Sequence, residues 1–154
     1  MANRKYLVVG TGGVGGSIAA FMALAGKDVT CIARGSHLQK INADGIHLKS
    51  FLKGDRRVPV KAFSAENYNG KADVVFVCVK GYSLNSVAEA ISRASTPQTV
   101  IIPVLNVFGT GEKLAAAIPN AHVLAGCIYI IVTKTADGEI TQQGEIFRIV
   151  FGNM

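Results

Sequence analysis

The chain has 154 residues, of which 49% are hydrophobic and 17% charged, and its net charge is +6. This length suits one domain with a sizeable core, and the apolar content excludes a disordered chain. No apolar stretch approaches the ~18 residues that a membrane-spanning helix needs, and the run after the basic start breaks too early at glycines for a signal peptide. We therefore expect one cytoplasmic domain, residues 1–154, with no membrane partner.

The charges and the cysteines favour no macromolecular partner or metal. The basic residues are scattered and no aromatic residues interleave with them, which argues against nucleic-acid binding. They include Lys40, Lys49, Lys53, Arg56, Arg57, Lys61, Lys71 and Lys80. The cysteines Cys31, Cys78 and Cys127 stand singly in apolar runs without C-x-x-C spacing. This pattern predicts buried thiols in a reducing compartment, and neither a zinc site nor a redox dithiol.

The first half of the chain alternates strands with helices. The expected elements are a strand at 5–9, a helix at 14–24 closed by Gly26, a buried strand at 28–33, and a short helix at 36–44 that Ser36 caps and Gly45 ends. Residues 45–64 are irregular. Alternating residues on either side of Lys53-Gly54-Asp55 predict a hairpin outside the main sheet.

The second half begins with the most apolar strand, at 73–80, and ends in strands alone. The expected elements are a helix at 84–95, a strand at 99–106, a helix at 112–117, and strands at 122–134, 138–143 and 145–151. Nearly continuous apolar strands that alternate with helices predict a parallel sheet covered on both faces. The fold class is α/β: a Rossmann-like doubly wound parallel sheet with antiparallel strands added at the C-terminal edge.

A glycine-rich segment, VVGTGGVGGSIAA, follows the first strand and opens the first helix. Gly10, Gly12 and Gly15 form the G-x-G-x-x-G pattern, which allows a tight turn, a close approach of the backbone to a pyrophosphate, and close packing of the helix on the sheet. The helix N-terminus adds unpaired N–H groups. We predict that a dinucleotide is held by Gly10, Thr11, Gly12, Gly13, Val14 and Gly15. The alternative is a glycine-rich turn with no ligand.

Arg34 stands at the end of the second strand, where an acid usually binds the ribose hydroxyls of NAD. Asp and Glu are both absent from residues 33–39. A guanidinium can hold a 2′-phosphate by charge-assisted hydrogen bonds. The sequence therefore predicts that Arg34, together with Ser36 and the N–H groups of its helix, binds the 2′-phosphate of NADP(H). It disfavours NAD and FAD as cofactors. The alternative is a solvated surface arginine.

Taken together, these motifs resemble the N-terminal domain of the ketopantoate reductases (2-dehydropantoate 2-reductases). The resemblance spans essentially all 154 residues and rests on the segments GTGGVGG, VTCIARGSHL, FVCVKGYSL, PVLNVFGTGEKL and GEITQQGEIFRIVFG. It implies an oxidoreductase that reduces a small 2-oxo acid, ketopantoate, to pantoate with NADPH, on the route to pantothenate. Whether the protein is a homo-oligomer stays open.

The resemblance also assigns roles beyond the glycine-rich segment. Lys80 matches a lysine that contacts the cofactor near the active cleft, and Asn106 an asparagine that contacts cofactor and substrate. Ala125 matches a residue whose backbone contacts the cofactor. Leu105 and Val107 flank Asn106 where the family commonly has Gln or His before it and Gly after it, which bears on substrate preference.

The family's catalytic lysine belongs to a helical C-terminal domain that we expect to be absent from this chain. No catalytic residue is therefore expected within it. Three functions stay open: the inactive cofactor-binding half of a ketopantoate-type reductase, a non-catalytic NADP-binding or sensing module, and another NADP-dependent hydroxy-acid, hydroxyacyl or sugar-nucleotide dehydrogenase. Arg34, Lys80 and Asn106 argue against the third.

Overall fold

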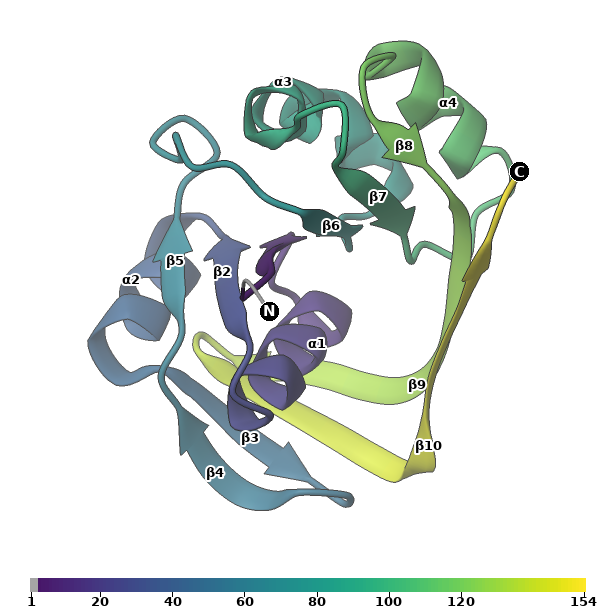
Figure 1. The fold of residues 1–154 in the computed structure, drawn as a ribbon. Coiled ribbons are helices and arrows are strands. Elements are labelled where there is room, and N and C mark those ends of the chain that lie inside the picture. Colours follow the sequence, from purple (N-terminus) through teal and green to yellow (C-terminus); the bar gives the residue numbers. More distant parts are fainter. Residues whose placement is uncertain (1–2) are drawn as a thin grey trace.

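The structure, a computed structural model, describes residues 3–154 and contains a six-stranded parallel sheet (Figure 1). Its strands, in the spatial order β5-β2-β1-β6-β7-β8, are β5 (Lys61–Phe63), β2 (Asp28–Ile32), β1 (Lys5–Val9), β6 (Val74–Val77), β7 (Val100–Pro103) and β8 (His122–Val123). The chain leaves β1 first toward β2 and β5, and later toward β6, β7 and β8. The carboxyl ends of β1 and β6 therefore mark the switch point at which doubly wound sheets bind ligands.

Helices cover both faces of this sheet, because its strands are apolar on both sides. The helices are α1 (Gly13–Leu24), α2 (Gly35–Asp44), α3 (Leu84–Ala94) and α4 (Thr110–Ala117), with a 3-10 turn, η1 (Gly81–Ser83), before α3. Leu7 of β1 packs in one core cluster with Ile91 of α3 and Leu114 of α4. Its neighbour Val8 packs in the other cluster with Ile18 of α1 and Ile41 of α2. None of these helices has the length and apolar content needed to cross a bilayer.

A second, four-stranded sheet lies beyond α1 (Figure 1). Its strands, in the order β4-β3-β10-β9, are β4 (Gly54–Val58), β3 (Ile46–Ser50), β10 (Glu139–Gly152) and β9 (Ala125–Ala136). β10 runs antiparallel to β9 and parallel to β3. A Cβ at Gly16 of α1 would lie 2.9 Å from the side chain of Ile140, so the absence of a side chain lets α1 lie close against this sheet.

The α/β class and the parallel sheet are confirmed, and the second sheet is the main departure from expectation. The C-terminal strands pair antiparallel as expected, but they join the β3–β4 hairpin instead of extending the main sheet, whose edge is β8. The residues expected as two last strands form the single strand β10, with an irregular register between Gln143 and Phe147. Within residues 45–64 the hairpin lies outside the main sheet as expected, whereas Lys61–Phe63 enters it as β5. The physical reason is burial: Ile46, Leu48 and Ile140 are at most 1% exposed and need the cover that this arrangement gives.

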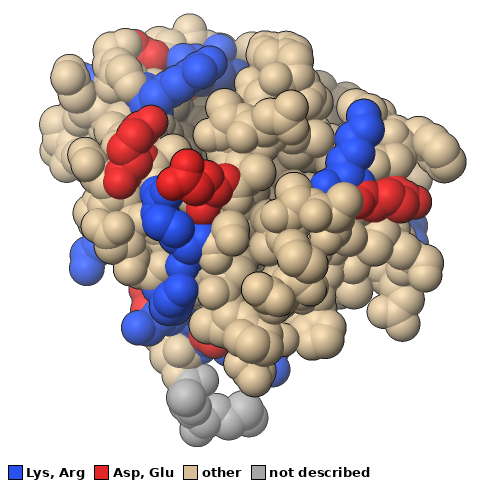
Figure 2. Space-filling model, turned by 90° about the horizontal axis from the view of Figure 1, so that it is seen from above, with Lys and Arg blue, Asp and Glu red and all other residues tan. Residues whose placement is uncertain are grey.

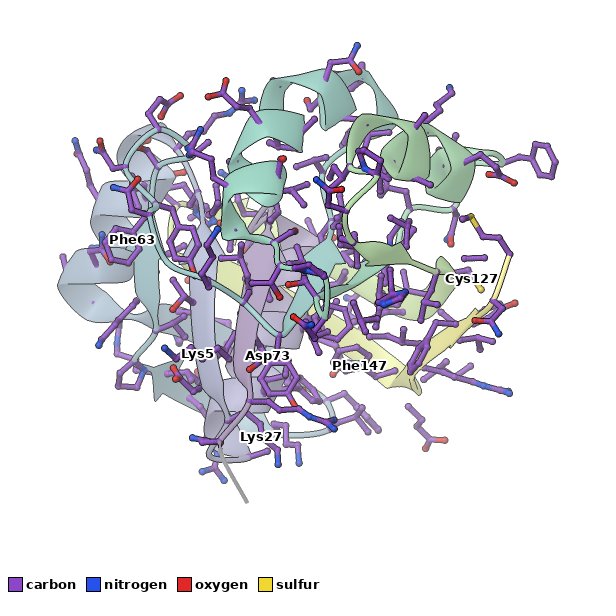
Figure 3. All side chains as sticks on the ribbon, turned by 45° about the horizontal axis from the view of Figure 1, so that its top comes forward. Lys5, Lys27, Phe63, Asp73, Cys127 and Phe147 are labelled. Carbon is purple, nitrogen blue, oxygen red and sulfur yellow. The ribbon has the colours of Figure 1, made fainter. Side chains whose placement is uncertain are left out.

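The amino edge of the main sheet carries no candidate site residue, and one hydrogen bond there joins the start of β1 to the residue before β6. The N–H of Lys5 donates to the Asp73 carboxylate at 2.7 Å, and Figure 3 shows both residues near the start of β1 and β6. On the face seen in Figure 2, lysine and arginine side chains are interspersed with acidic and uncharged ones.

Candidate functional site

The glycine-rich loop joins β1 to α1 at the carboxyl edge of the main sheet. Gly10 has a φ of +90°, and a Cβ there would lie 2.7 Å from Val79. A Cβ at Gly15 would lie 1.8 Å from the carbonyl oxygen of Gly10. At Gly12, however, an added Cβ would meet nothing within 4 Å. Packing therefore requires the first and third glycines of the pattern, while the second faces open space.

The N-terminus of α1 is available to an anion. Gly12 is the N-cap residue and makes no side-chain cap, and no acidic residue lies in the first turn. The N–H groups of that turn have no intrahelical acceptor, and the helix dipole adds partial positive charge there. Thr11, 3% exposed, points inward, and its hydroxyl donates to the carbonyl of Ile32 at 3.4 Å. The buried side of the loop is thus held by Thr11, and its other side is open at the N-terminus of α1.

Gly13 and Val14 belong to the first turn of α1 and complete the predicted grip. A Cβ at Gly13 would lie 3.3 Å from Val132 of β9, so the second sheet closely backs this turn. Val14 is partly buried against the core cluster that contains Ile18. Both residues could therefore contribute backbone N–H groups to a ligand, and neither presents a polar side chain.

Arg34 lies two residues after β2 as the N-cap residue of α2, and its side chain is exposed. None of the ion pairs found among residues 3–154 engages it. The first turn of α2 carries no acidic residue. A guanidinium and a second helix N-terminus thus lie at the same edge of the sheet as the first, a suitable place for another phosphate.

The prediction that Ser36 caps α2 is wrong. The helix already begins at Gly35, with Arg34 as its N-cap residue and no side-chain cap. The hydroxyl of Ser36 instead donates to Asp137 Oδ2 at 2.5 Å. The physical reason is that the carboxylate, in the turn between β9 and β10, offers this hydroxyl a charged acceptor.

Asp137 is a residue of this neighbourhood that sequence reasoning missed. Its carboxylate accepts hydrogen bonds from Ser36 and from Lys134 Nζ at 3.0 Å. These bonds, with the nearby charge of Lys134, hold the pKa of the Asp137 carboxyl below its ordinary value of 3.8. No local signal could have found it, because 101 residues separate Asp137 from Ser36.

Lys80 and Asn106 follow the adjacent strands β6 and β7, on the predicted edge. Lys80 is exposed, precedes η1, and forms no ion pair in the described part of the chain. The amide of Asn106 is engaged: Nδ2 donates to the carbonyl of Ile128 at 3.2 Å, and Oδ1 accepts from its N–H at 3.4 Å. Asn106 therefore ties the loop after β7 to β9.

Ala125 opens β9 beyond the carboxyl end of β7 and pairs with Gly152. Leu124 donates to the carbonyl of Ile101 just before it. A Cβ at Gly126, the next residue, would lie 2.3 Å from the carbonyl oxygen of Pro103. The backbone of Ala125 is thus fixed at the same edge as Lys80 and Asn106.

The three histidines lie away from the carboxyl ends of β6 and β7. His37 bonds to the carbonyl of Thr11 and to the N–H of Gly138. His47, in β3, lies 2.6 Å from Asp55 and 3.4 Å from Glu139. His122 is exposed at the start of β8. None of them is placed as a proton donor for a ligand beside Lys80 and Asn106.

The cysteines form no disulfide among the described residues. Burial raises the pKa of the Cys31 thiol from 9.0 to about 12, and burial likewise raises that of Cys78, with a smaller contribution from Cys31. A Cβ at Gly15 would lie 3.1 Å from Cys78, so this thiol packs directly beneath α1. The raised pKa values favour the neutral form of both thiols, which is a poor nucleophile.

Comparison with known proteins agrees with this geometry. Residues 6–154 match the family model described as Ketopantoate reductase PanE/ApbA. The uncharacterized oxidoreductase YkpB of Bacillus subtilis is 36% identical over 148 residues, which cover 96% of this chain and 48% of YkpB. The 2-dehydropantoate 2-reductase of Nostoc is 29% identical over 141 residues, 91% of this chain and 44% of that protein.

Among solved structures, the 2-dehydropantoate 2-reductase from Methylococcus capsulatus is similar over 97% of this chain and 48% of its own. The TM-score is 0.84 and the sequence identity 30%. The chain therefore spans about half the length of the relatives that it matches.

Proposed function

The chain belongs to the ketopantoate reductase PanE/ApbA family, and on this premise we propose that it is the NADPH-binding half of a cytoplasmic 2-oxo-acid reductase. The proposed reaction is the reduction of 2-dehydropantoate to pantoate, in pantothenate biosynthesis. The observation that carries the proposal is the pair of anion-binding positions at one edge of the sheet: the open N-terminus of α1 at Gly12, and Arg34 at the start of α2.

The glycine-rich loop fits the pyrophosphate of a dinucleotide. Space exists where a side chain at Gly12 would project, and the first-turn N–H groups of α1 adjoin that space. Since the side chain of Thr11 is buried, the loop would bind phosphate oxygens through its backbone alone. The nicotinamide, when bound, supplies the hydride, and the protein supplies position and charge.

Arg34 supports NADPH over NADH. Its exposed guanidinium is not engaged by the ion pairs of residues 3–154, so a 2′-phosphate would not have to displace a partner. Ser36 differs, because its hydroxyl already binds Asp137. In this proposal Arg34 and the N–H groups of α2 are the primary ligands of the 2′-phosphate.

Lys80, Asn106 and Ala125 lie toward the proposed nicotinamide side, after β6, β7 and β8. The ammonium of Lys80 would attract the carboxylate of the substrate, and the backbone of Ala125 would contact the cofactor. Asn106 would contact cofactor and substrate while it keeps the loop attached to Ile128. The proton that the reduced carbonyl requires would come from residues outside this half.

A non-catalytic NADP-binding module remains the second candidate. It agrees with the placement of the histidines as well as the first candidate does, because none of His37, His47 and His122 lies beside Lys80 and Asn106. Both candidates require the same cofactor site, and they differ in whether the whole protein consumes NADPH when ketopantoate is added.

Titration with NADPH and NADH tests the cofactor site that both candidate functions require. The unaltered chain should bind NADPH more tightly, and Arg34→Asp should narrow or reverse this preference by lowering NADPH affinity about tenfold or more. Arg148→Asp is the matched control, since Arg148 is an exposed arginine of β10 and the charge change is identical. Equal affinities of the unaltered chain for the two cofactors would refute the assignment to NADP.

A further inference from the structure

His37 connects the glycine-rich loop to the turn between β9 and β10. It lies in the first turn of α2, and its side chain is 11% exposed. One ring nitrogen, Nε2, lies 2.5 Å from the carbonyl oxygen of Thr11, which is 26 residues away in sequence. The other, Nδ1, accepts the N–H of Gly138 at 2.9 Å, across 101 residues.

These two partners determine the position of the ring proton. A backbone N–H can only donate, so Nδ1 must be the unprotonated nitrogen. A neutral imidazole then carries its proton on Nε2, which faces a carbonyl that can only accept. The surroundings thus select one tautomer, with both ring nitrogens satisfied by backbone groups of distant segments.

The bond to Thr11 bears on the orientation of the next residue. The carbonyl of Thr11 and the N–H of Gly12 belong to one planar peptide unit and point in opposite directions. Holding this carbonyl on the His37 side therefore directs the Gly12 N–H away from it. The loop needs such a restraint, because Gly10, Gly12 and Gly13 permit many backbone conformations.

We propose that His37 is a positioning residue for the cofactor pyrophosphate: its neutral ring holds the Thr11 carbonyl so that the Gly12 N–H faces the phosphate. This inference rests on the proposed dinucleotide-binding function. Gly138 keeps the ring in place, and the carboxylate of Asp137, in the same turn, lies 3.9 Å from Nδ1.

Two substitutions of His37 each remove one of the two hydrogen bonds of the ring. Glutamine places an amide donor near the position of Nε2, so His37→Gln retains a donor toward Thr11 and loses the acceptor for Gly138. Asparagine places an amide oxygen near the position of Nδ1, so His37→Asn retains the hydrogen bond from Gly138 and loses the one to Thr11. His122→Asn, at an exposed histidine of β8, is the control for the same chemical change.

The readout is the affinity for two fragments of the cofactor. ADP-ribose contains the pyrophosphate without a 2′-phosphate, and adenosine 2′-monophosphate contains the 2′-phosphate without the pyrophosphate. We expect His37→Asn to weaken ADP-ribose and NADPH about tenfold and to leave adenosine 2′-monophosphate unchanged. His37→Gln should retain most of the ADP-ribose affinity, and His122→Asn all of it.

The outcomes distinguish this inference from the proposed function. An unaltered chain that binds no NADPH would overturn the function. If the unaltered chain binds NADPH, two results would overturn the positioning role alone. Either His37→Asn binds ADP-ribose as tightly as the unaltered chain, or it loses affinity for both fragments equally. Should the variants unfold, nitrogen-15 NMR of the unaltered chain still decides, because a neutral His37 protonated on Nδ1 would overturn the proposal.

Discussion

The glycine-rich loop offers a matched pair of substitutions with opposite expected effects. A Cβ at Gly12 has open space around it, and the φ of −67° there is accessible to every residue. A Cβ at Gly15 would lie 1.8 Å from the Gly10 carbonyl oxygen, closer than atoms can approach. Gly12→Val should therefore give a folded protein that has lost cofactor binding, whereas Gly15→Ala should lose stability.

The magnitudes follow from these contacts. At the N-cap position of α1, Gly12→Val should cost about 0.5–1 kcal/mol of unfolding free energy, or roughly 1–4 °C in Tm. Its side chain projects where the pyrophosphate must approach, so NADPH affinity should fall about 100-fold or more, which is ~2.7 kcal/mol. Gly15→Ala must displace α1 or the Gly10 carbonyl by more than an ångström, and such overpacking costs about 1–3 kcal/mol or more.

Thermal unfolding followed by circular dichroism and titration of NADPH by its fluorescence check both variants, with the titrations done well below the lower Tm. A folded Gly12→Val protein with unchanged affinity for NADPH would refute the reasoning, because the second glycine would then have only a structural role. An unchanged Tm for Gly15→Ala would contradict the packing argument.

Two further results are expected. Residues 1–154 by themselves should show no ketopantoate-dependent oxidation of NADPH above background, because the lack of a general acid costs about 10²–10⁴-fold in rate. The absorbance of NADPH follows the reaction. Measurable turnover would place that acid within the chain. Burial raises the pKa of Cys31 from 9.0 to about 12, so between these pH values the thiol ionises only in the unfolded chain. The free energy of unfolding in urea should consequently fall as pH rises through this window, and less so in Cys31→Ala; an identical fall in that variant would count against the contribution of Cys31.

The part of the fold that the sequence predicts well is local in the chain. The strand β1, the glycine loop and α1 are consecutive in the sequence, although Gly10 also packs against the distant Val79. Leu7, Val8 and Val9 are all 0% exposed, which is why their unbroken apolar run correctly indicates a strand covered on both faces. Gly15 packs on Gly10, so even this tertiary contact joins neighbours in sequence.

The second sheet is harder to predict because it depends on pairings between distant segments. Ile140 of β10 is in register with Leu48 of β3, and neither strand alone indicates the other. The same distance hides the acceptor of the Ser36 hydroxyl, Asp137, so a serine at the start of a helix is misread as its cap. The alternating patterns predict which segments are strands. Which strands pair with each other depends on the apolar surface of α1 that they can cover.

The second sheet explains how the two sides of the candidate site are held in one frame. Near the start of β9, the backbone of Ile128 binds the amide of Asn106 and so fixes the loop after β7. At the far end of β9, the turn to β10 binds α2 through Gly138 and His37. One pair of strands thereby ties both the proposed nicotinamide side and the proposed adenosine side to the same support. The tail strands, which carry no proposed ligand side chain, thus connect the two sides a second time, in addition to the main sheet.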